Sequence, residues 1–129
     1  MRKFILFLIA PLALMSCQET LEERCAREAK EYTKKNCPTL VAQNITLDSM
    51  TFETKSHTIS YCYTVSGEID DSTVINSNNP RERLLEQVKN SPNLKLYKEA
   101  EYNFRYAYFS AKNNGTKLFE ATFRKKDYQ

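Results

Sequence analysis

Residues 104–123 read FRYAYFSAKNNGTKLFEATF, two aromatic segments on either side of Asn114-Gly115. Asn-Gly readily adopts the positive φ angles of a tight turn, and aromatic residues favour β-strands. We therefore predict a β-hairpin with a two-residue loop, in which Asn113 pairs with Thr116. This hairpin is the best-defined element that the sequence predicts.

The pairing next to the loop sets the two faces of this hairpin. It places Tyr108 opposite Ala121 and Tyr106 opposite Phe123 on one face, which we expect to be the core face. A slip of one residue would exchange the two faces. The opposite face carries three residues that could form a binding surface: Arg105, Phe109 and Arg124.

A second hairpin is predicted over residues 49–65, with its turn at residues 54–57. Both arms alternate in the way that half-buried strands do. If Phe52 pairs with Ile59, Met50 lies opposite Tyr61, and Tyr63 continues the same apolar face.

The first helix is predicted over residues 21–36. Thr20 and Glu23 have the separation of a capping box, and Pro38 prevents the helix from continuing. Apolar residues at spacings of four, four and three form one helical stripe: Leu21, Cys25, Ala29 and Tyr32.

A second helix is predicted to begin at Pro80, with Asn79 as its N-cap, and to end before Pro92. Its apolar stripe is Leu84, Leu85 and Val88. The polar segment 67–79 between the second strand pair and this helix is predicted to be a loop with a short irregular middle.

The order helix, hairpin, helix, hairpin predicts an α+β domain: one four-stranded antiparallel sheet with the helices on one face. Strand order is left open by the sequence. The nearest fold analogy is the cystatin-like arrangement, in which a twisted sheet grasps the first helix, and a fold analogy implies no function.

The chain begins in the manner of an exported protein. Arg2 and Lys3 precede an apolar run over residues 4–14, too short for a membrane-spanning helix. The sequence Leu14-Met15-Ser16-Cys17 resembles the lipobox of bacterial lipoproteins, in which a lipid such as palmitate modifies the cysteine that becomes the new N-terminus. The resemblance implies a signal peptide over residues 1–16, a lipidated N-terminus and short tether over 17–20, and a single domain over 21–129.

The lipobox resemblance also implies a location. Gln18 is not the Asp associated with retention in the inner membrane, so we expect a lipid-anchored protein of the bacterial outer membrane. Acidic residues after the cysteine resemble an export tag for the cell surface, although acidic residues also suit a helix N-terminus. Periplasmic and surface-exposed leaflets are therefore both left open.

Charge argues against nucleic-acid binding. The full chain has 19 basic and 16 acidic residues, and the signal peptide contains only Arg2 and Lys3 among them. The domain that remains is nearly neutral and lacks the dense basic face of a nucleic-acid binder.

Three cysteines remain once Cys17 is lipidated, so at most one disulfide can form within the chain. Cys25 and Cys37 would lie about 18 Å apart along the predicted helix, beyond the reach of a bridge. A bridge between Cys37 and Cys62 or between Cys25 and Cys62 is more plausible, and three free thiols are an equal alternative.

Several sequence blocks resemble small exported bacterial domains of unknown function. They are Asn36-Cys37-Pro38, Leu47-Asp48-Ser49, and Tyr61 with Tyr63-Thr64. The resemblance covers roughly residues 25–65. It implies an uncharacterised bacterial family and brings no catalytic residue with it.

We predict that the domain is not an enzyme. His57 is the single histidine and lies in a predicted turn, where no nucleophile and carboxylate are expected to converge on it. The acidic and Asn-rich segment 70–79 lacks the spacing of a calcium loop, and no zinc-type ligand pair is present. We therefore expect no metal and no cofactor. Catalysis by the Cys62 thiol is a weaker alternative.

The sequence favours a membrane-anchored binding domain of the bacterial envelope, with an envelope protein, a peptide or a glycan as its ligand. Inhibition of a hydrolase, either a protease or a glycan hydrolase, through the segment 67–79 is the alternative. Four inward tyrosines are expected to be packed core. Where the helices leave them uncovered, they would instead form a shallow amphipathic groove: Tyr61, Tyr63, Tyr106 and Tyr108.

Overall fold

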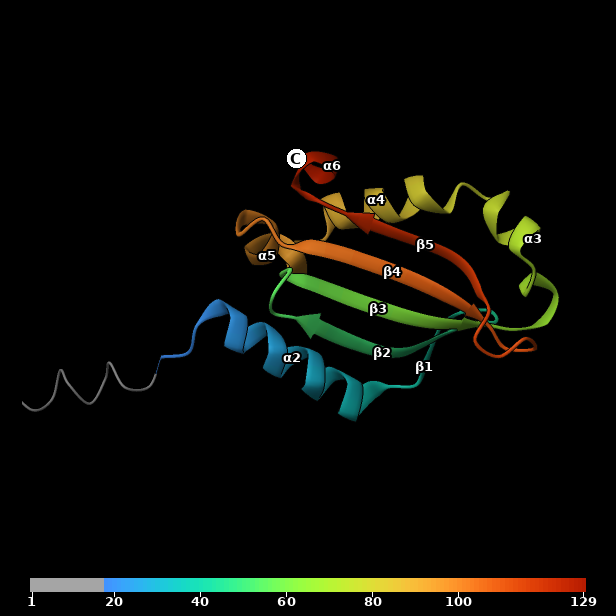
Figure 1. The fold of residues 1–129 in the computed structure, drawn as a ribbon, viewed down its shortest axis with the longest axis horizontal. Coiled ribbons are helices and arrows are strands. Elements are labelled where there is room, and N and C mark those ends of the chain that lie inside the picture. Colours follow the sequence, from blue (N-terminus) through green and yellow to red (C-terminus); the bar gives the residue numbers. More distant parts are fainter. Residues whose placement is uncertain (1–17) are drawn as a thin grey trace, which may run out of the picture.

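A computed structural model describes residues 18–129 of the chain (Figure 1). The predicted signal peptide, residues 1–16, and the predicted lipidation site Cys17 lie outside the described residues. Within residues 18–129, no helix combines the length and the apolar character needed to cross a membrane.

Helix α2 (Leu21–Asn36) begins at the predicted capping box. The Thr20 hydroxyl accepts a hydrogen bond from the Glu23 amide at 3.0 Å, and the Glu23 carboxylate accepts one from the Thr20 amide at 2.9 Å. Cys25 and Ala29 of the predicted stripe are buried. The start, the end and the buried face of this helix were therefore all predictable from local sequence.

The sheet has five strands in the order β1-β2-β3-β4-β5 (Figure 1). The strands are β1 (Thr39–Ala42), β2 (Ile45–Glu53), β3 (Thr58–Val65), β4 (Asn103–Ser110) and β5 (Lys117–Phe123). The α+β class is confirmed, but the predicted four-stranded antiparallel sheet is wrong in two respects. Strand β1 was not predicted, and the central strands β3 and β4 run parallel.

The long connection between β3 and β4 explains the parallel pair. It contains the 3₁₀ turns η2 (Gly67–Ile69) and η3 (Pro92–Leu94) and the helices α3 (Ser72–Asn76), α4 (Pro80–Asn90) and α5 (Lys95–Glu99). The connection leads from the end of β3 back to the end of the sheet at which β3 begins. Strand β4 therefore starts beside the start of β3 and runs parallel to it. Helix α4 starts at Pro80 as predicted, although the Asn79 side chain makes no capping hydrogen bond.

Strand β1 forms a short hairpin with β2 that the sequence did not reveal. Thr39 pairs with Leu47 and Ala42 pairs with Ile45, and Asn44 in the turn has a φ of 64°. The strand is only four residues long, and three of these residues are exposed. Its sequence therefore lacks the alternation of apolar and polar residues by which a half-buried strand is predicted.

The two predicted registers had different outcomes. In β2 and β3, Met50 pairs with Tyr61 and Phe52 with Ile59, as predicted. In β4 and β5, Tyr108 pairs with Phe119, so the predicted partner Ala121 was wrong by two residues. Because the difference is an even number of residues, each side chain keeps its predicted face.

The connection between β4 and β5 is longer than a two-residue loop. The Thr116 amide donates to the Asn113 carbonyl at 2.9 Å, and the Ser110 amide donates to the Thr116 carbonyl at 2.8 Å. Gly115 has a φ of 89°, whereas Asn114 is not among the residues with positive φ. The turn therefore uses the freedom of the glycine alone, and the strands begin pairing further from it.

The main core lies on the helix-covered face of the sheet. Cys25 of α2, Val88 of α4 and Phe104 of β4 belong to one cluster, and a short C-terminal helix, α6 (Lys125–Tyr128), packs Tyr128 against it. The other members are Ile59, Leu84, Tyr97, Tyr102, Tyr106, Ala121 and Phe123.

Candidate ligand-binding groove

The parallel pairing of β3 and β4 places four tyrosines on the helix-covered face. Tyr61 pairs with Tyr106, and Tyr63 pairs with Tyr108. The ring centroids of the first pair are 4.8 Å apart and those of the second pair 4.5 Å apart, with nearly parallel planes in both. The tyrosines therefore form a stacked array across the centre of the sheet.

The hydroxyls of this array are neutral donors. Burial raises the pKa of Tyr61 to about 12 and that of Tyr108 to about 12, and it raises the pKa of Tyr63 and of Tyr106 as well. Within residues 18–129 these four hydroxyls form no hydrogen bond to a protein group, and none is both enclosed and unpartnered. They can therefore donate to water or to a ligand.

A groove of about 370 Å³ lies at one end of the array, where Tyr63 and Tyr108 contribute to its lining. The β1–β2 hairpin forms one wall, and helix α4 with the segment before it forms the other. The residues of the walls are Val41, Ala42, Ile45, Ile69, Ile75, Asn78, Pro80, Arg83, Leu84 and Gln87. The groove thus depends on the unpredicted strand β1 and on the crossover.

The chemistry of the groove is mostly apolar, with a few polar groups on one side. Asn78, Arg83 and Gln87 are exposed and belong to the α4 side. Within residues 18–129, Arg83 has no ion-pair partner. Val41, on the opposite wall, is 50% exposed. Such a site suits a ligand that combines an apolar group with a hydrogen-bonding or anionic one.

A family model described as Domain of unknown function (DUF8479) matches residues 20–119. The chain belongs to this family. The expectation of an uncharacterised family is therefore confirmed. No curated protein matches the chain.

The fold of this DUF8479 domain is also present in a solved structure. The crystal structure of a "putative secreted protein" from Pseudomonas aeruginosa superposes with a TM-score of 0.66 and 13% sequence identity. The match covers 87% of this chain and 100% of that chain. At this identity the likeness establishes a shared fold.

The binding surface predicted from the sequence lies elsewhere on the domain. Arg105 and Phe109 lie on the sheet face opposite the core, where Arg105 forms an ion pair with Glu120 and Phe109 is half-buried. Arg124 follows the end of β5 and lines a separate cavity. None of the three residues lines the tyrosine groove, and the binding surface that they would form stays a prediction.

The three cysteines of the described domain are free thiols. The bridge between Cys37 and Cys62 is absent from the structure, and the pairing stays a prediction. Cys25 is buried in the core, and burial raises its pKa to about 12, with the nearby Glu28 carboxylate adding to the shift. Cys62 lies on the open face of β3, between Ser49 and Ala107 of the neighbouring strands.

His57 lies in the β2–β3 turn, where its side chain contacts two residues from other parts of the domain. Its ring stacks on Tyr102 with centroids 4.8 Å apart, and its Nε2 atom contacts the Glu22 carboxylate in the first turn of α2. The His57 carbonyl also accepts from the Asn103 amide at 2.9 Å. These contacts join the β2–β3 turn to α2 and β4, which is a structural role.

Proposed function

We propose that this chain is a lipid-anchored, non-enzymatic binding domain of the bacterial outer membrane, and that the tyrosine groove binds an extended peptide segment of a partner protein. The lipobox-like sequence ending at Cys17 supports the anchor. The shape and lining of the groove support the ligand class. The single observation that carries the proposal is the groove over Tyr63 and Tyr108.

A peptide fits the lining better than a glycan does. Seven of the groove residues are aliphatic or proline and lie beside two tyrosines, so an apolar side chain could be buried there. Asn78 and Gln87 could bind peptide amide or carbonyl groups at the rim. A glycan would instead require more polar groups around the stacked rings.

The segment 67–79 supports this role over the inhibitor alternative. The Asp71 carboxylate caps α3 by accepting from the amides of Thr73 and Val74, and the Asn76 side chain donates to the Leu118 carbonyl at 3.3 Å. The segment is therefore packed against β5, and through Ile75 it forms a wall of the groove. A loop that enters the active site of a hydrolase would have to project from the domain.

The groove can be tested by replacing Val41 in the full chain with a photo-crosslinking amino acid and irradiating living cells. We expect a discrete adduct whose partner fragment is a peptide by mass spectrometry. The same crosslinker at exposed Lys34 on α2 should give no such adduct. Adducts of equal yield at both positions, or a glycan in the adduct, would contradict the proposal.

A second variant tests whether the adduct depends on the groove. Ile75→Arg places a charged side chain in the groove and should abolish the adduct. Ser72→Arg adds the same side chain to the same helix outside the groove and should leave the adduct unchanged. Circular dichroism establishes that both variants are folded.

The anchor is tested separately by metabolic labelling with an alkyne-bearing palmitate analogue. The wild-type chain should incorporate the label and fractionate with outer membranes, whereas Cys17→Ser should remain unlabelled. An unlabelled wild-type chain would reject lipid anchoring and leave the groove proposal standing.

A further inference from the structure

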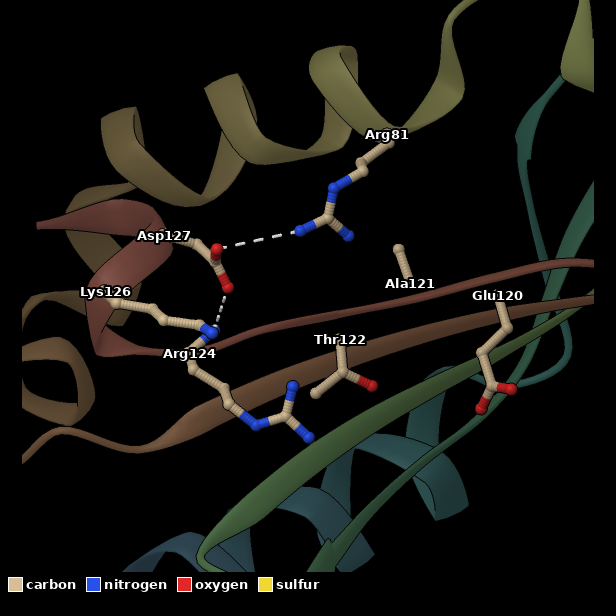
Figure 2. Close-up of a pocket in the computed structure, with 7 residues that line it drawn as sticks. All are labelled: Arg81, Glu120, Ala121, Thr122, Arg124, Lys126 and Asp127. Carbon is tan, nitrogen blue, oxygen red and sulfur yellow. Dashed lines mark hydrogen bonds and ion pairs between the residues drawn. The ribbon is translucent and has the colours of Figure 1, made fainter.

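A second cavity, of about 440 Å³, lies beside the end of β5 and is separate from the tyrosine groove. Its lining comes from α4, from the last residues of β5 and from the segment that enters α6 (Figure 2). The residues are Arg81, Glu120, Ala121, Thr122, Arg124, Lys126 and Asp127. Three of these seven side chains are cationic.

The two acidic residues of the cavity are already bound within the protein. Glu120 pairs with Arg105 and accepts from Lys117 at 2.6 Å, and these contacts, that of Lys117 first, lower the pKa of its carboxyl. The Asp127 carboxylate accepts from the Arg124 amide at 2.9 Å. Glu120 is therefore neutralised by cations outside the cavity, and the Asp127 carboxylate is held in place by the backbone.

The cations have weaker partners than the acids do. Arg81 lies 3.7 Å from the Asp127 carboxylate, and its guanidinium sits 4.9 Å from the centroid of the Phe123 ring, which holds it over the end of β5. Within residues 18–129, the side chains of Arg124 and Lys126 have no ion-pair partner and are exposed. The cavity consequently has an excess of positive charge.

The cavity also contains several side chains that can donate hydrogen bonds to an anion. Figure 2 shows the Arg81 side chain on the α4 side of β5, while Thr122 of β5 and Arg124, which follows β5, project on the other side of the strand. Guanidinium groups form paired hydrogen bonds to phosphate oxygens, and a hydroxyl or an ammonium group adds single ones. A phosphate group in the cavity could therefore accept hydrogen bonds from Arg124 and Lys126, with either Thr122 or Arg81 as a further donor.

We propose that this cavity binds a phosphate group, carried either by a phospholipid headgroup or by a soluble phosphate ester. The unpaired charges of Arg124 and Lys126 can neutralise the charge of about −1.5 to −2 on a phosphate monoester, or the single charge of the phosphodiester in a lipid headgroup. The site is independent of the tyrosine groove, since the two cavities share no lining residue.

The test uses isothermal titration calorimetry on the full chain purified in a non-ionic detergent. The probes are inorganic phosphate, glycerol 3-phosphate, and the short-chain lipids dihexanoyl phosphatidylglycerol and dihexanoyl phosphatidylcholine. We expect Arg124→Gln to weaken binding of the active probe about tenfold, the effect of losing one charge-assisted contact. Arg124→Lys should retain part of the affinity, because it keeps the charge without the planar fork.

A matched control removes an arginine far from the cavity. Arg24→Gln on α2 should bind the active probe as the wild type does. Binding of phosphatidylglycerol above phosphatidylcholine, lost in Arg124→Gln, supports a headgroup. Binding of phosphate or glycerol phosphate with the same dependence supports a soluble ester. Binding by no probe, or equal loss in Arg24→Gln and Arg124→Gln, would overturn the proposal.

Discussion

Asp70 is a buried carboxylate that holds the connection between β4 and β5. Its side chain is 3% exposed, and one oxygen accepts from the Lys112 amide at 3.0 Å. Hydrogen bonding from the Ser110 hydroxyl, and then from the Lys112 backbone, lowers the pKa of this carboxyl. A lowered pKa means that the ionised form stabilises the folded state, so the contribution is present above the ordinary pKa near 4 and is lost as the pH falls below it.

We predict that Asp70→Asn lowers the urea midpoint at pH 7 and that the difference from wild type narrows at pH 3. The reason is that the Asp70 carboxyl binds a proton in the unfolded wild-type chain below its ordinary pKa near 4, and in the folded state only at lower pH, so its ionised form stabilises the wild type less as the pH falls. Equilibrium unfolding followed by circular dichroism at both pH values measures this. Asp71→Asn is the matched control, because Asn caps a helix about as well as Asp. An equal deficit at both pH values would contradict the prediction.

Residue patterns located the capping box but not the role of Asp70. The pair Thr20 and Glu23 can be identified because both partners lie three residues apart in one helix turn. Asp70 and Lys112 are 42 residues apart, and Asp70 lies in a polar segment typical of a solvated loop. Its burial depends on the crossover, which local sequence does not specify.

At the scale of elements, α2 completes the edge of the sheet. The Thr33 hydroxyl donates to the Met50 carbonyl at 2.8 Å and accepts from the Met50 amide at 2.9 Å. The Thr33 hydroxyl thus provides a hydrogen-bond partner for the amide and the carbonyl of Met50 in β2. Strand β1 is too short to pair with this residue. The helix is thereby fixed to β2 as well as to the core.

We predict that Thr33→Val lowers the free energy of unfolding by about 1–3 kcal/mol, because the half-buried amide and carbonyl of Met50 lose their partner. Thr33→Ser keeps the hydroxyl and should retain most of the stability. Urea unfolding of both variants measures the difference. Destabilisation by serine as large as that by valine would contradict the prediction, because serine keeps the hydroxyl and loses only the methyl group.

The two hairpins show what local sequence can determine about an element. The turn at residues 54–57 and the alternation beside it were sufficient to predict the pairing of Met50 with Tyr61, because the irregularity between Leu47 and Ser49 lies beyond that pair. In the other hairpin, an irregularity between Tyr108 and Phe109 and a long turn changed the pairing by two residues. Bulges depend on tertiary context, so the faces were predictable there and the partners were not.

At the scale of the whole molecule, one core joins both long helices to the sheet. Cys25 of α2 is 1% exposed and contributes to the same cluster as Val88 of α4 and Phe104 of β4. Neither helix can leave the sheet without exposing that cluster. We therefore expect the domain to unfold as a single cooperative unit.

The Cys25 thiol provides a direct measure of this cooperativity. In a Cys37→Ser, Cys62→Ser background, we predict that alkylation of Cys25 by iodoacetamide at increasing urea follows the circular dichroism transition. The thiol is enclosed, and its raised pKa of about 12 keeps it protonated in the folded state. Alkylation well before the loss of secondary structure would show that α2 detaches independently.

The global arrangement was the part that the sequence predicted least. The α+β class and the helix-covered aromatic face followed from alternation and helical spacing. The parallel pairing of β3 with β4 depends on the path of residues 66–102, and it determines which tyrosines stack. The groove could not be placed before that path was known, since its walls come from β1 and the crossover.

Side chains from two helices form hydrogen bonds with strand backbone groups near the two borders of the sheet. Thr33 binds Met50 on one side, and Asn76 binds the Leu118 carbonyl on the other. Unpaired strands at such borders are where separate copies of a protein join into fibrils. Blocking these backbone groups should consequently make the domain less prone to edge-to-edge aggregation at high protein concentration.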